Sequence, residues 1–327
     1  MAAAIRHVLF YERMYMKQYI GIEIGGTKQQ AASFDENGAL IELKSERIAL
    51  NRGAEDILDW MRETVPRLIC VETVGIGVGF GGIVETATGK SYCSVQVSGW
   101  ADFPVRDWFA EEFRLPVVVV NDTVCGGYAE LLQGAGRGSD AFFYTNIGTG
   151  CGGAMFRNGV NLDGVGTGAA YHGQLWVPEP ETGKPVRMET VCSGPAIEAR
   201  LRRKGYVPEN SMLWTLCGGD VSKLTCREWA QSAKSGDAFA LDDMDRWAES
   251  YAVALTDILA VLAPERIAIG GGVANCGEPL FDAIRRHTDA MTFISMKGKY
   301  RILPCETGDL AVLIGAAMYA RDGFKTL

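Results

Sequence analysis

Apolar residues follow the same order of strand-like runs and glycine turns near the start of each half of the chain. Residues 19–24 form an apolar run, and residues 30–34 form a second one after a Gly-Gly-Thr turn. Residues 142–147 and 151–156 repeat this order around another glycine turn. Short turns of this kind join neighbouring strands into hairpins. The sequence therefore predicts two hairpins of similar design, each with a glycine-rich turn.

Helix-like and strand-like patterns alternate through the rest of the chain. Apolar residues recur there either at helical spacing or in short buried runs. Helices are expected at 54–68, 105–113, 123–132, 249–262, 280–286 and 311–320, and strands at 74–79, 117–120 and 266–269. Alternation of this kind is typical of an α/β protein built on a largely parallel core sheet.

Length and composition are those of a globular protein with room for two domains. The chain has 327 residues, of which 47% are apolar and 22% are charged. A chain of this length can bury two cores of ordinary size without disulfides or metals. The net charge of -8 and the lack of a long basic run argue against a nucleic-acid partner.

Targeting and redox signals point to the cytoplasm. No run of about 18 apolar residues occurs, so no membrane-spanning segment is predicted. Residues 1–15 do not resemble a secretory signal peptide, and we expect the native chain to start at Met16. The nine cysteines include no pair in CxxC spacing, which is typical of reduced thiols. We therefore expect a cytoplasmic protein with no membrane partner.

Two glycine-rich segments could hold phosphate groups, because glycine lets backbone N–H groups approach an anion closely. They are GIEIGGTK at 21–28 and NIGTGCGG at 146–153. The alternative for each is a plain turn between two strands. NIGTGCGG and GVGFGG at 77–82 also match GxGxxG, but as dinucleotide fingerprints both are weak. That fingerprint needs a following helix, whereas residues 154–159 indicate a strand and a turn.

Asp122 is the candidate catalytic base. It follows the predicted buried strand at 117–120, and α/β sheets place their ligands at the carboxyl ends of such strands. The alternative is that Asn121 or Asp122 merely caps the helix that follows.

His172 and the glycines at 270–272 are two further candidates. His172 follows a glycine-rich stretch and is one of three histidines. The alternative is a structural histidine that only makes hydrogen bonds. The three glycines lie between a predicted strand and a predicted helix, where they could admit a nucleotide base or simply form a tight turn.

Five segments in this order resemble the ROK family (repressor, open reading frame, kinase), whose enzymes phosphorylate glucose, N-acetylated hexosamines, fructose and related sugars. They are GIEIGGTK, NDTVCGGYAE, NIGTGCGG, IAIGGGV and GDLAVLIGAA, and the resemblance runs from about residue 17 to about residue 320. It implies an α/β, two-lobed actin-like ATPase (ribonuclease H-like) fold, in which a cleft lies between two α/β domains. The expected lobes are 17–122, to which a closing helix at 308–322 returns, and 123–307.

The resemblance also implies a role for each candidate residue. Asp122 would be the general base that takes the proton of the attacking sugar hydroxyl. Glu23 stands where the family usually has an aspartate that helps to hold hydrated Mg²⁺. The nucleotide and its phosphates would be held by Gly25, Gly26, Thr27, Lys28, Gly148, Thr149, Gly150, Gly271 and Gly272. The sugar would be bound by Gln96, Asn121, Asp122, His172 and Glu189.

Departures from the family pattern concern the sugar and a metal. Ala169 replaces a sugar-binding glutamate, a loss worth ~1.5–3 kcal/mol for a charged partner, and Gln96 replaces an asparagine. Many members carry a structural zinc on the histidine and three cysteines. Residues 183–188 occupy that region here, and Cys192 alone cannot complete four ligands. The sequence therefore predicts no zinc, and a substrate somewhat different from the family's usual glucose.

The resulting prediction is an ATP-dependent kinase for a hexose or hexose derivative, with Mg²⁺, ATP and a small-molecule sugar as its ligands. A homodimer or homotetramer is a family expectation. One alternative is a non-catalytic sugar or nucleotide sensor, which Ala169 suggests but the retained Asp122 and Glu23 disfavour. Another is a sugar-responsive repressor lacking its DNA-binding domain, which the short segment before residue 21 and the acidic charge disfavour.

Overall fold

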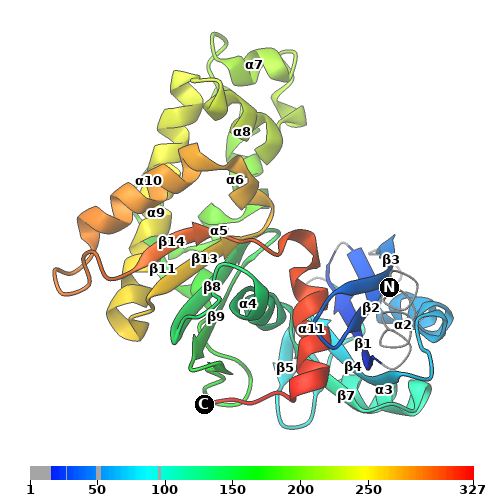
Figure 1. Cartoon of the computed structure of the whole chain (residues 1–327). Coiled ribbons are helices and arrows are strands. Elements are labelled where there is room, and N and C mark those ends of the chain that lie inside the picture. The colour runs from blue at the N-terminus through cyan, green and yellow to red at the C-terminus, as the bar shows by residue number, and fades with distance from the viewer. Residues whose placement is uncertain (1–15, 27, 49–52, 95–96) are drawn as a thin grey trace, which may run out of the picture. The chain divides into compact units, whose positions relative to one another are not determined.

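The computed structural model describes residues 16–26, 28–48, 53–94 and 97–327. The chain forms two compact units, both visible in Figure 1. The first comprises Met1–Ala129, Val160–Ala169 and Asp309–Leu327, as far as these are described, and the second comprises Glu130–Gly159 and Ala170–Gly308. Within the described ranges, no helix has the length and apolar character needed to cross a membrane.

The first unit is built on a five-stranded mixed sheet in the order β3-β2-β1-β4-β7. Its strands are β1 (Gln18–Ile24), β2 (Lys28–Asp35), β3 (Leu40–Arg47), β4 (Thr73–Phe80) and β7 (Val117–Asn121). The sheet is accompanied by helices α2 (Gly53–Thr64), α3 (Val105–Phe113) and α11 (Ala311–Asp322) and by the start of α4 (Asp122–Gln133). The same unit contains the 3₁₀ turns η1 (Val65–Arg67) and η5 (Gly308–Leu310) and the hairpin of β5 (Ile83–Glu85) and β6 (Lys90–Cys93).

The expectation of a largely parallel sheet was only partly right. β1, β4 and β7 are parallel, but β2 is antiparallel to both of its neighbours, β1 and β3. The reason is the length of the connections, because a short turn can only reverse the chain, whereas a parallel pair needs a crossover. The predicted hairpins thus supply the antiparallel half of the sheet.

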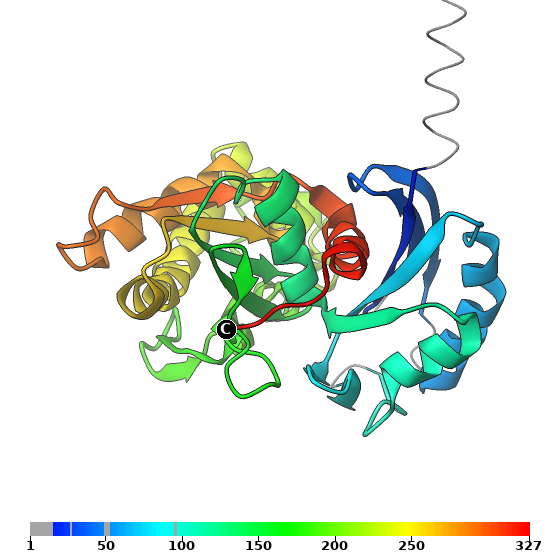
Figure 2. The same ribbon diagram turned by 60° about the horizontal axis from the view of Figure 1, so that its bottom comes forward.

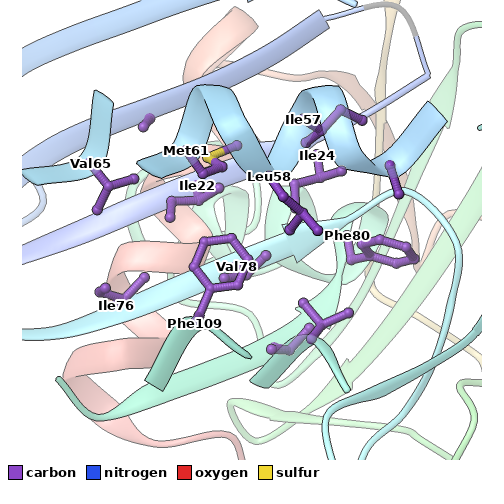
Figure 3. Packing of buried hydrophobic residues seen from close by; sticks show 14 of the residues in the cluster. Ile22, Ile24, Ile57, Leu58, Met61, Val65, Ile76, Val78, Phe80 and Phe109 are labelled. Carbon is purple, nitrogen blue, oxygen red and sulfur yellow. The ribbon is translucent and has the colours of Figure 1, made fainter. Parts of the chain in front are cut away.

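One face of this sheet carries the apolar core of the first unit. Side chains alternate between the two faces along a strand, so Ile22, Ile24 and Val78 point to the same side. Figure 3 shows them against Ile57 and Leu58 of α2, and all five are almost fully buried. The amphipathic spacing of α2 therefore provides the cover that this face of the sheet requires.

Glycines on the opposite face of the sheet allow α11 to pack closely against it. In β4, a Cβ at Gly77 would overlap the carbonyl oxygen of Ala316, and one at Gly75 would lie 3.8 Å from Ala320. Two residues along a strand span about 6.7 Å, and four residues along a helix span about 6 Å. The spacing of the two glycines on β4 therefore matches the spacing of their two contact residues on α11. Figure 2 shows α11 on this side and α2 and α3 on the other. The last helix, α11, belongs to the first unit.

The second unit contains another mixed sheet, in which β9, β8, β13 and β14 follow one another. β8 and β9 are antiparallel, whereas β13 is parallel to both β8 and β14. These strands are β8 (Ala141–Ile147), β9 (Cys151–Arg157), β13 (Arg266–Gly270) and β14 (Arg301–Pro304). A separate hairpin is formed by β11 (Trp176–Pro178) and β12 (Pro185–Arg187). The short β10 (Val160–Asn161) belongs to the first unit.

Helices of the second unit include the long α9 (Ala238–Leu262), which packs against α10 (Glu278–Met291). The others are α5 (Glu189–Cys192), α6 (Gly194–Leu201), α7 (Met212–Leu216) and α8 (Cys226–Lys234), with 3₁₀ turns η2 (His172–Gln174), η3 (Val221–Lys223) and η4 (Gly272–Cys276). On α9, Trp247 stacks on Tyr251 with ring centroids 5.0 Å apart, and both rings are fully buried. This stack fixes the Tyr251 hydroxyl inside the unit.

Candidate active site

Asp122 lies at the junction of β7 and α4, at the carboxyl end of a parallel strand. Its Oδ1 accepts a hydrogen bond from Thr123 N at 2.7 Å. Asn121 caps the same helix, because its Oδ1 accepts from Thr123 N at 3.0 Å and its Nδ2 donates to Gly82 O at 3.0 Å. Asn121 therefore caps the helix, and sugar contact by Asn121 stays a prediction. The second carboxylate oxygen of Asp122 is not needed for the cap.

The surroundings of Asp122 tune its acidity. Burial raises the pKa of the carboxyl from 3.8 to about 6, against the opposing effect of the Thr123 hydrogen bonds. The residue is still partly exposed, so a hydroxyl group can reach it. Gly81 lies beside it, since a Cβ there would be 3.3 Å from Oδ2. The sequence analysis did not predict that Gly81 lies beside Asp122, although Gly81 belongs to the glycine-rich segment 77–82.

Glu23 places a second carboxylate in the same unit, near the carboxyl end of β1. It is 8% exposed, and its Oε2 lies 3.3 Å from Nζ of Lys28. Burial raises its pKa from 4.5 to about 7, although Lys28 lowers the pKa, and the charge of Asp122 adds to the increase. This contribution indicates that the two carboxylates of the first unit lie close enough to interact electrostatically.

Glu23 suits a hydrated Mg²⁺ ion better than a dehydrated one. Its Oε2 is buried, and its described partner is the Lys28 ammonium at 3.3 Å. Mg²⁺ usually keeps several waters and binds through one or two carboxylates together with substrate phosphates. Among the described residues, no group of three or more His, Cys, Asp or Glu side chains is arranged to hold a metal by itself.

The first glycine turn follows Glu23 directly. Gly25 N donates to Lys28 O at 3.2 Å, which closes the turn between β1 and β2. Gly26 is partly exposed in the same turn. Lys28 starts β2, and its Nζ contacts both Glu23 and Oε1 of Gln30, the latter at 2.9 Å. The predicted ligand Thr27 lies outside the described residues, as does Gln96.

The second glycine turn, residues 148–150, belongs to the second unit. Gly148 N donates to Gly150 O at 2.9 Å, and Gly148 O accepts from Gly194 N at 2.9 Å. A Cβ at Gly148 would meet nothing within 4 Å, so one side of the turn is open to a ligand. Asn146 steadies the following strand by accepting from Gly152 N at 2.9 Å, a contact that the sequence analysis did not foresee.

His172 lies inside the second unit, with a fully buried ring. Its Nδ1 is 3.0 Å from Oγ1 of Thr145, which itself donates to Gly152 O at 2.8 Å. Because the Thr145 proton is committed to Gly152, Nδ1 is the donor and the histidine is the Nδ1–H tautomer. Burial lowers its pKa to about 3, so the ring is neutral. This is the hydrogen-bonded alternative given above, and sugar contact by His172 stays a prediction.

Glu189 and the glycines after β13 both lie near the second turn. Oε2 of Glu189 accepts a hydrogen bond from Cys151 N at 2.8 Å, immediately after the turn. Gly271 has a φ of 85°, and a Cβ there would overlap the carbonyl oxygen of Ile147 at the end of β8. Only glycine fits this position. A Cβ at Gly272 would meet nothing within 4 Å, so the following residue leaves space for a ligand.

Comparisons with known proteins agree with this arrangement. A family model described as the ROK family matches residues 19–323. The chain is 31% identical to a glucokinase from Halalkalibacterium halodurans over 83% of this chain and 85% of that protein, and 28% identical to a glucokinase from Thermotoga maritima over 93% and 97%. It is also 28% identical to a ROK family glucokinase from Streptomyces griseus, solved with glucose and AMPPNP, with a TM-score of 0.81 over 94% of this chain and 100% of that one. These likenesses confirm the predicted actin-like α/β fold.

Proposed function

The chain belongs to the ROK family and is a sugar kinase, and from this premise we propose that it transfers the γ-phosphoryl group of ATP to a hydroxyl of a hexose or hexose derivative. The observation that carries the proposal is the position of Asp122, at the carboxyl end of β7 with one oxygen anchored and the other free of the helix cap. Sugar and ATP are the substrates.

Asp122 acts as the general base. As the sugar oxygen bonds to the γ-phosphorus, its proton moves to Oδ2 of Asp122, and the bond from phosphorus to the oxygen of the leaving ADP breaks. The Thr123 N–H holds Oδ1 and so fixes the direction in which Oδ2 points. A base on a neutral alcohol needs to be ionised, and Asp122 is ionised above its raised pKa of about 6.

Glu23 and Lys28 serve the phosphate end of the reaction. Mg²⁺, when bound, neutralises the charge that develops on the phosphate oxygens. Glu23 would hold this ion through its water shell, and its buried Oε2 supports that role. Until the ion binds, the positive charge of Lys28 balances the negative charge of the Glu23 carboxylate. Backbone N–H groups of both glycine turns would face the phosphates, with Gly271 and Gly272 on the adenosine side.

The sugar end differs from the family pattern. Gln96, Asn121, His172 and Glu189 are the proposed sugar ligands, whereas Ala169 offers no carboxylate. Oδ1 of Asn121 accepts from Thr123 N and Val124 N, and Nδ2 donates one of its two N–H groups to Gly82 O, so the second N–H group could serve a sugar. We therefore propose a substrate somewhat different from glucose.

The test is ADP formation from Mg-ATP with a panel of hexoses, N-acetylhexosamines and sugar acids, each compared with a reaction that lacks sugar. At least one member is expected to raise the rate of ADP formation well above the sugar-free rate. If ATP binds but no sugar on the panel stimulates turnover, the kinase reaction is contradicted and the sensor alternative is favoured.

The pH dependence of kcat/KM should show an acid limb near pH 6. Asp122 is protonated below its pKa of about 6 and cannot then accept a proton, so kcat/KM rises as pH increases through this value. Initial rates at saturating Mg²⁺ between about pH 5 and about pH 9 measure this limb. A profile that stays flat from pH 5 to pH 8 would argue against Asp122 as the base.

A further inference from the structure

The side chain of Glu189 reaches the backbone of the second glycine turn. Its Oε2 accepts a hydrogen bond from Cys151 N at 2.8 Å. A Cβ at Gly150 would lie only 2.6 Å from the same oxygen. The carboxylate therefore occupies the space that any side chain at position 150 would need. Glu189 and Gly150 form a matched pair, in which the glycine makes room for the glutamate.

The second carboxylate oxygen of Glu189 remains available. Oε1 accepts no hydrogen bond from any described residue, and the side chain as a whole is partly exposed. A carboxylate can accept several hydrogen bonds at once, because each oxygen has two lone pairs. Contact with the turn through Oε2 therefore leaves the proposed sugar contact through Oε1 open.

Glu189 is held rigidly by the segments on both sides of it. It is the first residue of α5, and Met188 N, just before it, donates to Leu175 O at 2.9 Å. Gly173 packs so closely that a Cβ there would lie 3.2 Å from Cβ of Glu189. Upstream, the Arg187 guanidinium lies 4.3 Å above the Trp176 ring, which braces the β11–β12 hairpin. Supports of this kind are what keep a functional side chain in one geometry.

Other described groups hold the turn on either side of Cys151. Gly148 is held through Gly194, and Gly152 through Asn146 and Thr145. Between these points, Glu189 supplies the side-chain acceptor for Cys151 N–H. A hydrogen bond to a charged acceptor is about twice as strong as one between neutral groups. Loss of this acceptor would release the middle of the segment that presents N–H groups to phosphate.

We infer that Glu189 is a positioning residue for the second phosphate-binding turn, in addition to the sugar contact proposed for it. One carboxylate oxygen fixes the backbone that receives the nucleotide phosphates, and the other is left for the proposed sugar contact. The inference rests on the proposed function, because it takes the turn at 148–150 as a nucleotide site. It predicts an effect of Glu189 on nucleotide affinity when no sugar is present.

The test is the Kd of AMPPNP with Mg²⁺ and without sugar, measured by calorimetry for the wild type, Glu189→Gln and Glu189→Ala. The alanine variant should bind AMPPNP roughly tenfold more weakly. The glutamine variant should stay within about threefold of the wild type, because its amide oxygen can still accept from Cys151 N–H. Glu209→Ala, an exposed glutamate of the same unit, is the matched control and should leave the Kd unchanged.

Gly150→Ala supplies an independent arm that works even if Glu189→Ala folds poorly. Its methyl group would push the carboxylate away, so it should also weaken AMPPNP binding about tenfold. In the double variant this clash is gone, and the Kd should match that of Glu189→Ala alone rather than show both losses. Equal Kd values for the wild type, Glu189→Ala and Gly150→Ala would overturn the inference only. A wild type that binds no AMPPNP would overturn the proposed function with it.

Discussion

Asp122→Asn is expected to lower kcat by roughly 10²–10⁴-fold, which is the range that a positioned general base contributes. The amide oxygen can still accept the Thr123 hydrogen bond at the start of α4, so the helix cap and the fold should survive. The side chain can no longer take a proton from the sugar hydroxyl. Steady-state turnover, together with the Kd values of the sugar and AMPPNP, would separate lost chemistry from lost binding.

Asp107→Asn is the matched control for this experiment. Asp107 lies on α3 in the same unit, and its side chain is exposed. The control should keep the kcat of the wild type. A kcat for Asp122→Asn within about threefold of the wild type would argue against proton transfer to this residue.

Asp122→Asn should also stabilise the folded protein, whereas most substitutions destabilise one. Burial raises the pKa of Asp122 above its ordinary 3.8, so the folded state binds its proton more tightly than the unfolded state. Ionised Asp122 therefore costs folding free energy, and this cost appears as pH rises through the ordinary value to about 6. Asp122→Asn should melt above the wild type at pH 8, and the difference should shrink below about pH 4.

Glu130→Ala is expected to destabilise the protein by about 4 kcal/mol, because each buried donor left without a partner costs ~1–3 kcal/mol. Glu130 is fully buried near the end of α4. Its Oε1 accepts from Glu306 N at 2.9 Å and Thr307 N at 2.7 Å, and its Oε2 accepts from Ala135 N at 2.8 Å. One carboxylate thus satisfies the end of a helix and a loop that is far away in the sequence.

Denaturant unfolding of the purified protein measures this loss directly. Glu130→Gln should lose less than Glu130→Ala, because one amide oxygen still accepts while the NH₂ group opposes a donor. Glu249→Ala, an exposed glutamate on α9, should stay within about 0.5 kcal/mol of the wild type. A loss below about 1 kcal/mol for Glu130→Ala would show that the surrounding donors find other partners.

Much of the fold could be predicted from local patterns. The run at 19–24 and the helical spacing at 54–68 became β1 and α2, although the last residues of that helix form the separate turn η1. These elements follow from alternation and helical periodicity, which are properties of neighbouring residues. The position of Asp122 could be predicted for the same reason, since a buried strand immediately precedes it.

Contacts between distant segments could not be predicted in this way. The spaced glycines of β4 read as part of a weak phosphate motif, but Gly77 is needed because the backbone of α11 packs against it. Glu189 reaches Cys151 across 38 positions of sequence. His172 is buried on Thr145 because of packing that its own neighbours in the sequence do not reveal. Such roles depend on tertiary approach, which no local pattern encodes.

The most direct measurement of the central claim follows the transferred group itself. ATP carrying ¹⁸O at the γ-phosphoryl oxygens is incubated with Mg²⁺, the protein and the sugar that gives the highest kcat/KM, and the products are analysed by mass spectrometry. A kinase that uses Asp122 as base should deliver the labelled phosphoryl group to the sugar, with this product formed by the wild type and nearly absent with Asp122→Asn. Label found in inorganic phosphate and not in the sugar, or equal sugar phosphate from both proteins, would contradict the account.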